Sequence, residues 1–583
     1  MPKIEVFEDA LFRAIDVHLD NESLEKLFTC AKAELDEPVN DEGIIKVELN
    51  DTNRPDLWST AGLARQLRIY RSAATGGSAE IPEYDFFSRA GDIKASGERR
   101  IKVDPSVNSV RPWITGFAVR GQKISEAVLN DIIQTQEKLC WNFGRKRKAI
   151  AMGVYRSSLV QYPVQYKAVD PETTRFTPLG MDGEMSLREI IADHPKGQEY
   201  GHIVADMERM PFITDANDEV LSFPPIINSA KIGAVEAGDE ELFIELTGTE
   251  LKALILTASI VACDLADMGF EILPVTVEYP YDTPFGREIT LPYYFQDPVE
   301  VDSTFVSRYL GVGISNQEVI AALARMGVRA QDLGMGRISV TPPEYRNDFL
   351  HPVDVAEDVM IGRGMDSFKP EMPSDFTLGR LTDTERFSRR VKTMMVGLGF
   401  QEMIFNYLGS GRDFIENMYP EDEWDAARDR FIQVANPLSE NFEWVRPSCL
   451  PSLLTAEAVS ANAAYPHKTF EVGKVVRRDD ADNYGSVTLD SLAFVHSDAG
   501  AGFNDVHAQV STLLYFIAPD FVIRELEDSR FIAGRSAEIF ASDGLTSLGV
   551  FGEVHPRVLE AFGIDVPCTA CELVLNPLVV AQG

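Results

Sequence analysis

The segment "PPEYRNDFLHPVDVAEDVMIGRG", residues 342–364, concentrates negative charge around one expected helix start. Pro352 suits the first helical turn because its missing N–H is not needed there. Gly362 is a typical stop, so we expect a helix of about ten residues. Three acidic residues spaced i, i+3 and i+4 share one helix face and a fourth precedes the helix; they are Asp354, Glu357, Asp358 and Asp348.

Two interpretations of this acidic cluster follow from its spacing. The carboxylates could bind Mg²⁺ or Ca²⁺, because both cations prefer ligands that are all oxygen. Alternatively, acidic residues in a first turn complement the positive end of the helix dipole. Spacing alone leaves both interpretations open.

Length and composition predict several packed domains. At 583 residues the chain is too long for one core, and about 150 residues per domain suggests about four. No run approaches the roughly 20 apolar residues that span a bilayer. The N-terminus carries acidic residues where a signal peptide carries basic ones. We therefore expect a cytoplasmic protein with no membrane partner.

The charge balance argues against nucleic-acid binding over the whole surface. The chain has 55 Lys and Arg against 91 Asp and Glu, a formal net charge of −36, whereas phosphate binding requires clustered Lys and Arg. The one compact basic run is "GRKRK", residues 144–148. This run could contact RNA or form a solvated loop. No binding to DNA is expected.

Periodicity and turn-rich stretches divide the chain into four expected parts. Residues 1–90 alternate short strands with helices, and residues 91–285 form a strand-heavy domain. Residues 286–370 form a smaller unit that contains the acidic helix, and residues 371–583 form the last domain. The expected fold class is multidomain α+β.

Three stretches together resemble a known family. They are "NDTNRPDLWSTAGLARQLR" (50–68), "PPEYRNDFLHPVDVAEDVMIGRG" (342–364) and "NPLSENFEWVRPSCLPSLL" (436–454). Their order over nearly the whole chain is similar to that of phenylalanyl-tRNA synthetase β subunits. "HPKGQEYGHIV", "FPPIINS" and "TGTEL" resemble the archaeal and eukaryotic-cytosolic type of that family.

The resemblance implies a ligase subunit with two partners. These are a catalytic α subunit, in an (αβ)₂ tetramer, and tRNA(Phe), which the complex charges with phenylalanine using ATP. It also implies an α+β editing domain, a winged-helix-like metal-binding module and a degenerate class II synthetase-like domain with an antiparallel sheet. The family's Mg²⁺ ligands match four residues in type and spacing, which favours the metal interpretation: Asp348, Asp354, Glu357 and Asp358.

The last domain resembles a class II synthetase core that has lost its ATP site. Such a core needs one arginine in its second motif and another in its third, to hold the phosphates of ATP. The stretches that look equivalent, "KTFEVGKV" (468–475) and "LGVFGEVHPRV" (548–558), lack both, and Glu471 stands without its arginine. We expect this domain to pack against the α subunit, with "NFEWVRPSCLPSLL" at that interface or in the core.

The strand-heavy domain resembles the family's editing module. A pocket for phenylalanine rejects the same ring bearing a hydroxyl only about 10²-fold, so Tyr-tRNA(Phe) must be hydrolysed elsewhere. A second pocket that hydrogen-bonds the hydroxyl discriminates well, because its polar groups stay unpaired with phenylalanine. By resemblance in spacing, Glu245 is expected to read the hydroxyl, and Asn228 and Thr249 to position the ester or water. Ser229 and Thr247 are further candidates.

Simpler interpretations of these residues stay open. Thr on a strand is commonly a choice of strand propensity, and Asn-Ser before a glycine is commonly a turn. The chain also departs from the archaeal pattern at Cys140 and at Tyr155-Arg156. The alternative function is therefore an architectural, tRNA-binding subunit that does not edit.

Overall fold

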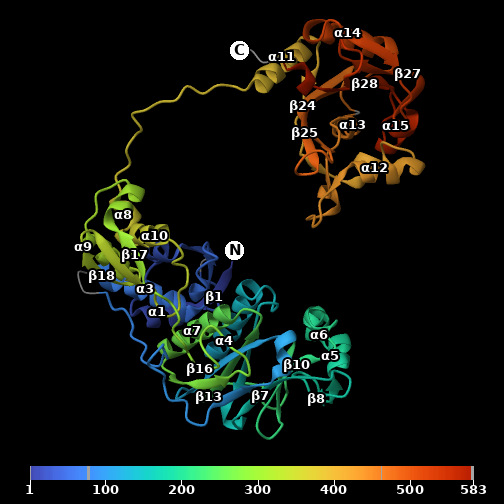
Figure 1. The fold of residues 1–583 in the computed structure, drawn as a ribbon. Helices are drawn as coiled ribbons and strands as arrows, with labels where there is room; N and C mark the ends of the chain where they lie inside the picture. The colour runs from blue at the N-terminus through green and yellow to red at the C-terminus, as the bar shows by residue number, and fades with distance from the viewer. Residues whose placement is uncertain (1, 38, 75–78, 461, 580–583) are drawn as a thin grey trace. The chain divides into compact units, whose positions relative to one another are not determined.

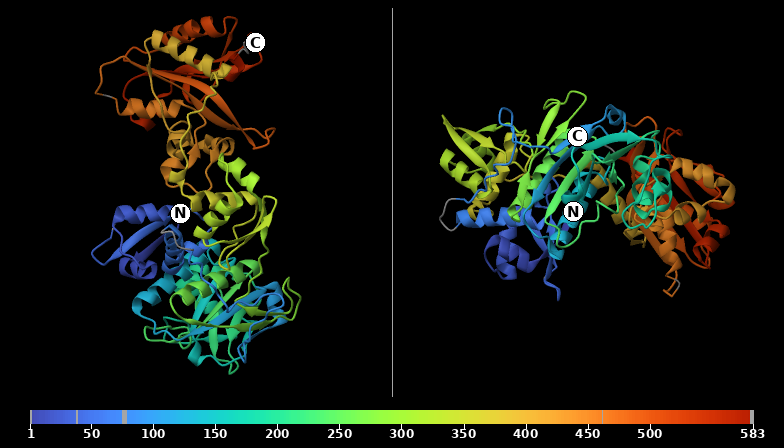
Figure 2. Two further views of the ribbon diagram at one scale, coloured as in Figure 1. Left: turned by 90° about the vertical axis from the view of Figure 1, so that its left-hand side faces the viewer. Right: turned by 90° about the horizontal axis from the view of Figure 1, so that it is seen from below.

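The structure, a computed structural model, describes residues 2–37, 39–74, 79–460 and 462–579 (Figure 1, Figure 2). The chain divides into two compact units, residues 1–371 and 372–583. Within the described ranges, no helix is both long and apolar enough to cross a membrane.

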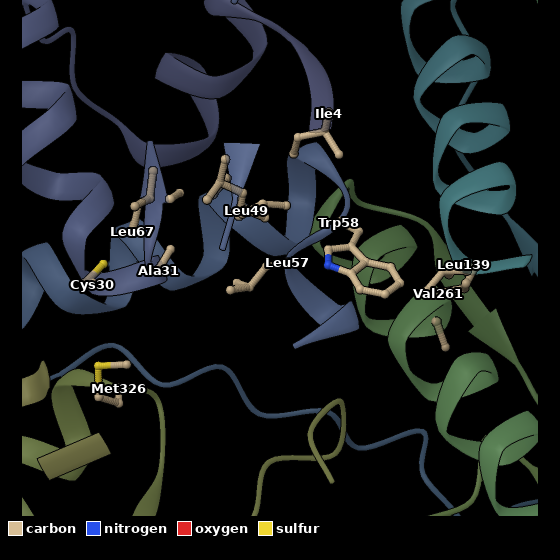
Figure 3. Close-up of a cluster of buried hydrophobic side chains, with 14 of the residues drawn as sticks. Ile4, Cys30, Ala31, Leu49, Leu57, Trp58, Leu67, Leu139, Val261 and Met326 are labelled. Atoms are coloured by element: carbon tan, nitrogen blue, oxygen red, sulfur yellow. The ribbon is translucent and has the colours of Figure 1, made fainter. Parts of the chain in front are cut away.

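The first unit begins with a small antiparallel sheet in the order β1-β3-β2. Strand β3 alternates half-buried and buried residues, so one of its faces joins the hydrophobic core. That core includes Trp58, Leu67 and Ile4 (Figure 3). The elements are β1 (Lys3–Phe7), α1 (Glu8–Ile15), α2 (Asn21–Phe28), β2 (Ala33–Glu37), β3 (Ile44–Leu49) and α3 (Thr60–Ala74).

Two larger sheets follow in the first unit. One has four strands in the order β14-β5-β13-β6, and the other has seven in the order β12-β11-β10-β7-β4-β15-β16. Their strands are β4 (Arg100–Val103), β5 (Trp113–Arg120), β6 (Ile150–Arg156), β7 (Val164–Val169), β10 (Met210–Thr214), β11 (Val220–Phe223), β12 (Ile227–Asn228), β13 (Glu241–Gly248), β14 (Glu271–Leu273), β15 (Val275–Glu278) and β16 (Glu288–Leu291). Because β16 pairs with β15, this sheet extends past the expected boundary at residue 285.

Strand β13 separates two cores by the alternation of its side chains. Leu242, Ile244 and Leu246 belong to the core that includes α4 (Glu126–Lys138) and α7 (Leu251–Asp267). Phe243 belongs to the core on the opposite face, with residues of the seven-stranded sheet. A short two-stranded sheet and two helices lie beside that sheet: β8 (Arg175–Phe176), β9 (Met185–Ser186), α5 (Leu187–Asp193) and α6 (Pro195–Tyr200).

The acidic helix belongs to a compact group with a three-stranded antiparallel sheet, β17-β19-β18. The helix α10 (Pro352–Arg363) runs through Gly362, so the expected stop at that residue is wrong. A Cβ on Gly362 would lie 2.0 Å from the carbonyl oxygen of Ala322, because two helices approach closely there; the left-handed Gly364 (φ 92°) ends the helix instead. The other elements are β17 (Val299–Asp302), α8 (Ser303–Leu310), α9 (Asn316–Arg325), β18 (Arg329–Gly334) and β19 (Arg337–Thr341).

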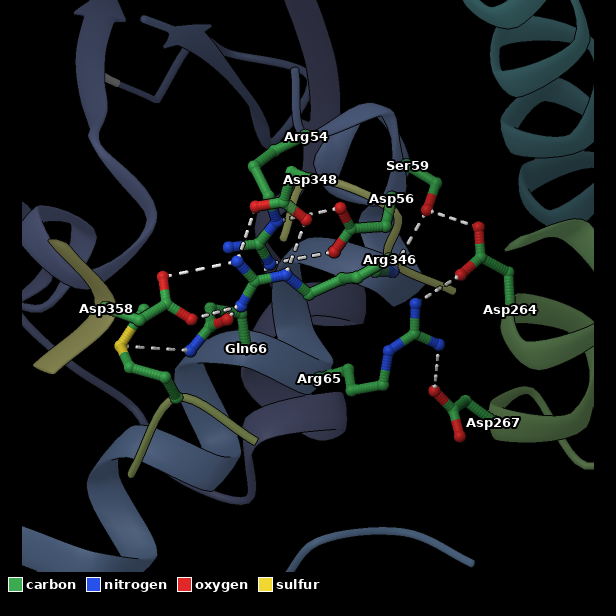
Figure 4. A network of polar contacts seen from close by, with 12 residues as sticks. Arg54, Asp56, Ser59, Arg65, Gln66, Asp264, Asp267, Arg346, Asp348 and Asp358 are labelled. Atoms are coloured by element: carbon green, nitrogen blue, oxygen red, sulfur yellow. Dashed lines mark hydrogen bonds and ion pairs between the residues drawn. The ribbon is translucent and has the colours of Figure 1, made fainter. Parts of the chain in front are cut away.

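A buried arginine joins the segment before α10 to the helix itself (Figure 4). Arg346 donates to Asp348 at 2.6 Å and to Asp358 at 2.6 Å, and its side chain is 1% exposed. Arg54, from the N-terminal part, is buried nearby and pairs with Asp56 at 2.8 Å. Burial alone would raise the pKa of Asp348, but the charge and hydrogen bonds of Arg346 lower it to about 2.

A second buried arginine joins α3 to α7. Arg65 pairs with Asp264 at 3.0 Å and Asp267 at 2.7 Å, and its guanidinium lies 4.1 Å from the ring centroid of Tyr345. Burial raises the pKa of Asp264 to about 7 although Arg65 acts in the opposite direction. Three stretches far apart in sequence are thus tied together by buried charges.

The second unit is built on a seven-stranded sheet in the order β20-β24-β25-β29-β28-β27-β26, antiparallel except for the β20–β24 pair. Leu492 and Phe494 of β25 pack in one core with α11 and α14, and Ala493 and Val495 pack in another with α13 and α15. Helices therefore cover both faces (Figure 1). The elements are α11 (Asp383–Gly397), β20 (Gln401–Glu402), β21 (Leu408–Gly409), α12 (Trp424–Arg430), β22 (Ile432–Gln433), β23 (Trp444–Val445), α13 (Leu450–Ala458), β24 (His467–Arg478), β25 (Ser486–Ser497), α14 (Phe503–Ile517), β26 (Val522–Glu525), β27 (Phe531–Phe540), β28 (Ser547–Val554), α15 (Pro556–Phe562) and β29 (Cys568–Val574).

We predict that Arg65→Met strongly destabilises the first unit. The variant leaves Asp264 and Asp267 without a counter-charge, which costs about 3–5 kcal/mol when such a pair is buried. Urea unfolding of the full chain at pH 8 measures the loss. The control is Arg120→Met, whose carboxylate partner Glu271 is exposed. Equal losses in the two variants would contradict the prediction.

Candidate functional site

The centre of the site is Glu245, on the face of β13 that points toward the seven-stranded sheet. Its neighbours across both adjacent strands are glycines, Gly116 on β5 and Gly153 on β6. A Cβ on Gly153 would lie 2.7 Å from Oε1 of Glu245. The glycine therefore provides the space that the carboxyl group occupies.

Glu245 is buried and only half satisfied. Its Oε1 accepts a hydrogen bond of 2.8 Å from the Tyr155 hydroxyl, which also lies 2.9 Å from the Ser222 hydroxyl. Because the phenol has one proton, Ser222 donates to Tyr155 when Tyr155 donates to Glu245. Among the described residues, Oε2 of Glu245 has no hydrogen-bond partner. Burial raises the pKa of Glu245 to about 7, against the Tyr155 hydrogen bond and the charge of Arg111.

Glu245 lines a cavity of about 400 Å³. Side chains from α4, β6 and the β11–β12 hairpin make its wall largely apolar; they include Ile132, Met152, Val154, Pro225, Ile226 and Ile227. Its polar members are Gln136, Arg147, Lys196, Ser222, Asn228 and Glu245. A hydrophobic cavity with a few polar groups is typical of a site for a small apolar group with one polar end.

The structure brings two of the five expected editing residues to this cavity, Glu245 and Asn228. The Asn228 amide donates to the Val154 carbonyl at 3.4 Å. Ser229 is buried in the following turn, where its hydroxyl accepts from the backbone N–H of Ile232. Thus Asn228 and Glu245 can contact a ligand directly, and Ser229 shapes the backbone beside them.

The two threonines lie outside the cavity wall. Thr247 is fully buried, and its hydroxyl accepts a hydrogen bond of 3.0 Å from Arg111. Thr249 is exposed beyond the end of β13, and its backbone N–H donates to Ala149. Because side chains alternate along a strand, Thr247 lies on the same face of β13 as Glu245. It is two residues further along the strand, outside the cavity wall.

Three residues of the site lie outside the set that the sequence predicts: Tyr155, Ser222 and Arg147. Tyr155 is one of the departures from the archaeal pattern, and its hydroxyl is the partner of Glu245. Arg147, from the basic run, donates to the carbonyls of Pro225 and Ile226 in the cavity wall. The signal that could have identified Arg147 is the compact basic run itself.

The four carboxylates of the acidic segment do not form the expected metal site. Asp348 and Asp358 both hold Arg346, Asp354 accepts the backbone N–H groups of Leu350 and His351, and Glu357 pairs with Lys32. In the part of the chain that the structure describes, no group of three or more His, Cys, Asp or Glu is arranged to hold a metal ion. These residues therefore do not fit Mg²⁺, because a guanidinium already occupies the space between two of them.

Glu471 in the second unit pairs with an arginine from another stretch, while residues 468–475 lack the motif arginine as expected. Arg446, from "NFEWVRPSCLPSLL", donates to both of its oxygens at 2.8 and 3.0 Å, and both side chains are buried. Leu450 and Leu453 of the same stretch lie in a hydrophobic core. The stretch therefore serves the interior of this unit, and its arginine is engaged by a protein carboxylate.

Three family models match the chain. They are the Phe-tRNA synthetase beta subunit B1 domain over residues 1–73, the tRNA synthetase B5 domain over residues 299–365, and the phenylalanyl tRNA synthetase beta chain CLM domain over residues 369–575. The B5 match contains the acidic helix α10. The CLM match contains all seven strands of the large sheet in the second unit.

Relatives match over the whole length. The phenylalanine–tRNA ligase beta subunit of Borrelia hermsii is 47% identical over 579 residues, covering 99% of this chain and 100% of that protein. The subunit of Borrelia turicatae is 48% identical over 581 residues, with coverage of 99% and 100%. The names of these relatives do not state the archaeal or eukaryotic-cytosolic type, so that type stays a prediction.

A solved structure also resembles the chain. The crystal structure of an N-terminal fragment of the phenylalanyl-tRNA synthetase beta subunit from Pyrococcus horikoshii is 32% identical, with a TM-score of 0.57, and covers 62% of this chain and 100% of that one. Family models, relatives and this structure agree. The chain therefore belongs to the family of phenylalanine–tRNA ligase β subunits and is a subunit of that aminoacyl-tRNA ligase.

Proposed function

We propose that this chain supports the ATP-dependent attachment of phenylalanine to tRNA(Phe) by an α subunit, in a cytoplasmic (αβ)₂ tetramer, and that it hydrolyses Tyr-tRNA(Phe). The observation that carries the editing assignment is the buried Glu245, whose second oxygen has no partner among the described residues, in the wall of a largely apolar cavity. The apolar wall suits an aromatic ring, and the carboxyl group suits a hydroxyl on it.

Glu245 discriminates tyrosine from phenylalanine because only the tyrosine hydroxyl can complete the hydrogen bonding of its carboxyl group. A tyrosine hydroxyl that reaches Oε2 satisfies a buried polar atom, whereas phenylalanine leaves it unsatisfied. Hydrogen bonds to charged groups contribute about 1.5–3 kcal/mol, which corresponds to roughly 10–100-fold in rate or affinity. This preference for tyrosine is the reverse of the preference in the charging site, which must reject the same hydroxyl.

Tyr155 is a positioning residue for this discrimination. Its hydroxyl engages Oε1 of Glu245 while its ring stacks on Phe243 with the centroids 6.0 Å apart. A carboxyl group held at one oxygen has less rotational freedom, so its other oxygen is presented in one direction. Ser222 completes the chain of hydrogen bonds behind Tyr155.

The hydrolysis itself requires a positioned water. Attack by water on the ester carbonyl forms a C–O bond to the water oxygen, and the bond to the ribose oxygen breaks as that oxygen takes up a proton. Asn228, beside the cavity, can orient either the ester carbonyl or the water through its amide group.

The second unit is proposed to be class II synthetase-like without an ATP site, and to pack against the α subunit. Its largely antiparallel sheet and the engagement of Arg446 by Glu471 support this assignment. Large apolar side chains at its surface suit a protein partner: Ile404 is 83% exposed, Tyr407 55% and Leu438 99%. The ligase's ATP and its Mg²⁺ are then held by the α subunit.

The group of α8–α10 and β17–β19 is proposed to be a winged-helix-like module with an arginine in place of a metal. Arg346 provides the positive charge that Asp348 and Asp358 require. A Mg²⁺ ion at this position would have to displace a buried guanidinium held by two carboxylates.

We predict that Glu245→Ala lowers the preference of the assembled enzyme for hydrolysing Tyr-tRNA(Phe) over Phe-tRNA(Phe) by roughly 10–100-fold. Charging with phenylalanine should be unchanged, because it takes place on the α subunit. Tyr155→Phe, which keeps the ring, should lower the preference in the same direction. Rates with the two preformed aminoacyl-tRNAs measure both effects.

The control for this experiment is Glu241→Ala, at the exposed start of the same strand. Unchanged preference in Glu245→Ala would remove the hydroxyl-reading role from this pocket. Charging without any hydrolysis by the wild type would support the alternative of a scaffold subunit that does not edit.

The stability of the chain should reveal the protonation of Glu245. Because its pKa is raised to about 7 in the folded state, its contribution to stability is fully present below the unfolded pKa of about 4.3 and is lost as pH rises through about 7. Relative to Glu245→Gln, the wild type should lose about 3 kcal/mol between pH 4.5 and 8. Urea unfolding of both proteins across this range tests the effect, and parallel profiles would contradict it.

Removal of divalent metal should leave the acidic helix intact. We expect the thermal midpoint of the wild-type chain to be the same in EDTA and in millimolar Mg²⁺. Arg346→Met leaves two buried carboxylates unpaired, so this variant should be less stable and should be stabilised by Mg²⁺. Stabilisation of the wild type by Mg²⁺ would show instead that a cation displaces Arg346.

A further inference from the structure

The second unit contains a cavity of about 620 Å³ on one face of its large sheet. The floor includes a row of three side chains on neighbouring strands, because Glu538 of β27 pairs with Val550 of β28, and Val550 pairs with Glu572 of β29. Val550 also packs against the core that includes α13 and α15, so the row belongs to that face of the sheet. All lining residues of the cavity belong to the second unit.

The wall of this cavity collects positive charge. Four arginines line it, from the end of α12, the end of β24 and the loop before β27; they are Arg430, Arg477, Arg478 and Arg530. The whole chain has a net charge of −36, so four cations around one cavity reverse that charge locally. None of the four lies in residues 468–475 or 548–558, where the motif arginines are missing.

Three of these arginines have donors that no protein group uses. Arg477 and Arg478 are exposed, and among the described residues their side chains form no hydrogen bond, ion pair or ring contact. Arg430 donates through Nε to the carbonyl of Ala426 at 3.2 Å, and in the same ranges no carboxylate lies within ion-pair distance of it. Since each guanidinium has five N–H donors, most of this capacity remains for a ligand.

The fourth arginine is held in place by the protein. Arg530 donates to the two oxygens of Asp528 at 3.0 and 2.6 Å, and its side chain is 14% exposed. The guanidinium groups of Arg530 and Arg430 each lie 5.8 Å from the ring centroid of Tyr419. Asp528 and the ring of Tyr419 therefore position two of the four cations before a ligand arrives.

The carboxylates of the wall do not neutralise these arginines. Both oxygens of Glu572 accept hydrogen bonds of 2.8 Å, one from the Ser448 hydroxyl and one from the backbone N–H of Cys449. Glu538 accepts a hydrogen bond of 2.6 Å from the hydroxyl of the first residue of β28. Asp429 is exposed, and within the described part of the chain no cation lies within ion-pair distance of it. The unused hydrogen-bonding capacity of the wall is therefore mainly that of donors.

These unused donors identify the chemical class of the ligand. Guanidinium groups bind phosphate oxygens in a planar, bidentate geometry, and several of them around one site favour a group with two or more negative charges. The volume of about 620 Å³ is typical of sites for small molecules. Part of the wall is apolar and suits an uncharged part of such a molecule; it includes Phe431, Leu548, Val550 and Val574.

We propose that this cavity binds a phosphorylated small molecule, with Arg477 and Arg478 on its phosphate groups and its uncharged part against the apolar wall. The site is separate from that of the ATP used in charging, which the proposed function assigns to the α subunit. It is also independent of editing, because it uses no residue of the pocket of Glu245.

The test uses the full-length chain without the α subunit, so that no ATP site of a partner contributes. Isothermal titration calorimetry at low salt measures binding of pyrophosphate, AMP and adenosine. Pyrophosphate and AMP should bind, and AMP should bind roughly 10–100-fold more tightly than adenosine, which has no phosphate. Arg477→Gln and Arg478→Gln should each weaken binding of AMP by roughly 10–100-fold, because each removes charged donors.

The matched control is Arg412→Gln, which removes an exposed arginine of the same unit that lies outside the cavity wall. It should leave AMP binding unchanged, and equal thermal midpoints should show that all three variants are folded. Absence of binding by both pyrophosphate and AMP would overturn the proposal. Equal losses in Arg412→Gln and Arg477→Gln would also overturn it, because they would show only general attraction of anions to positive charge.

A second measurement separates a small-molecule site from an RNA contact. If tRNA(Phe) binds in a way that requires Arg477 while neither pyrophosphate nor AMP binds, this face contacts RNA and the proposal fails. Hydrolysis of Tyr-tRNA(Phe) by the assembled enzyme tests the proposed function independently. Loss of the phosphate site would therefore leave the editing assignment untouched, and loss of editing would leave this site untouched.

Discussion

The first unit depends on the rule that a buried charge must be paired. Arg65 holds two carboxylates of α7, and Arg346 holds one carboxylate of α10 and one from the segment before it. Arg65 and Asp264 are 199 positions apart in the sequence, and Arg346 and Asp358 are 12 positions apart. Because each guanidinium is satisfied only when these segments meet, the network specifies how the N-terminal part, α7 and the acidic helix pack together.

The candidate site departs from this rule at Glu245 and at the buried Arg111 near it. Arg111 donates to carbonyl groups and to the Thr247 hydroxyl, and one oxygen of Glu245 has no partner among the described residues. By contrast, Arg65 and Arg346 each hold two carboxylates. Among the described residues, Oε2 of Glu245 therefore remains able to accept a hydrogen bond at the cavity. A ligand in the cavity can reach this oxygen.

The acidic segment shows why charge patterns in a sequence are ambiguous. The spacing correctly predicts that Asp354, Glu357 and Asp358 lie on one helix, α10. Four carboxylates close together also require neutralisation. The neutralising groups are Arg346, only two residues from Asp348, and Lys32, more than 300 residues from Glu357. Arg346 lies in the same short segment as the four carboxylates, whereas Lys32 lies far from that segment in the sequence. Local pattern thus established the need for positive charge but not its source.

The sequence by itself determined the family, the multidomain mixed architecture and the helix that begins at Pro352, because these follow from motifs and local periodicity. Only the tertiary structure decided which groups complete the site. Tyr155 and Ser222 come from different sheets, and Arg147 reaches the cavity wall from the basic run. Thr247 and Thr249 fit the same local pattern but lie outside the cavity. The physical reason is that the local backbone sets the direction in which a side chain points. Its hydrogen-bond partners depend instead on which strands and turns meet in space.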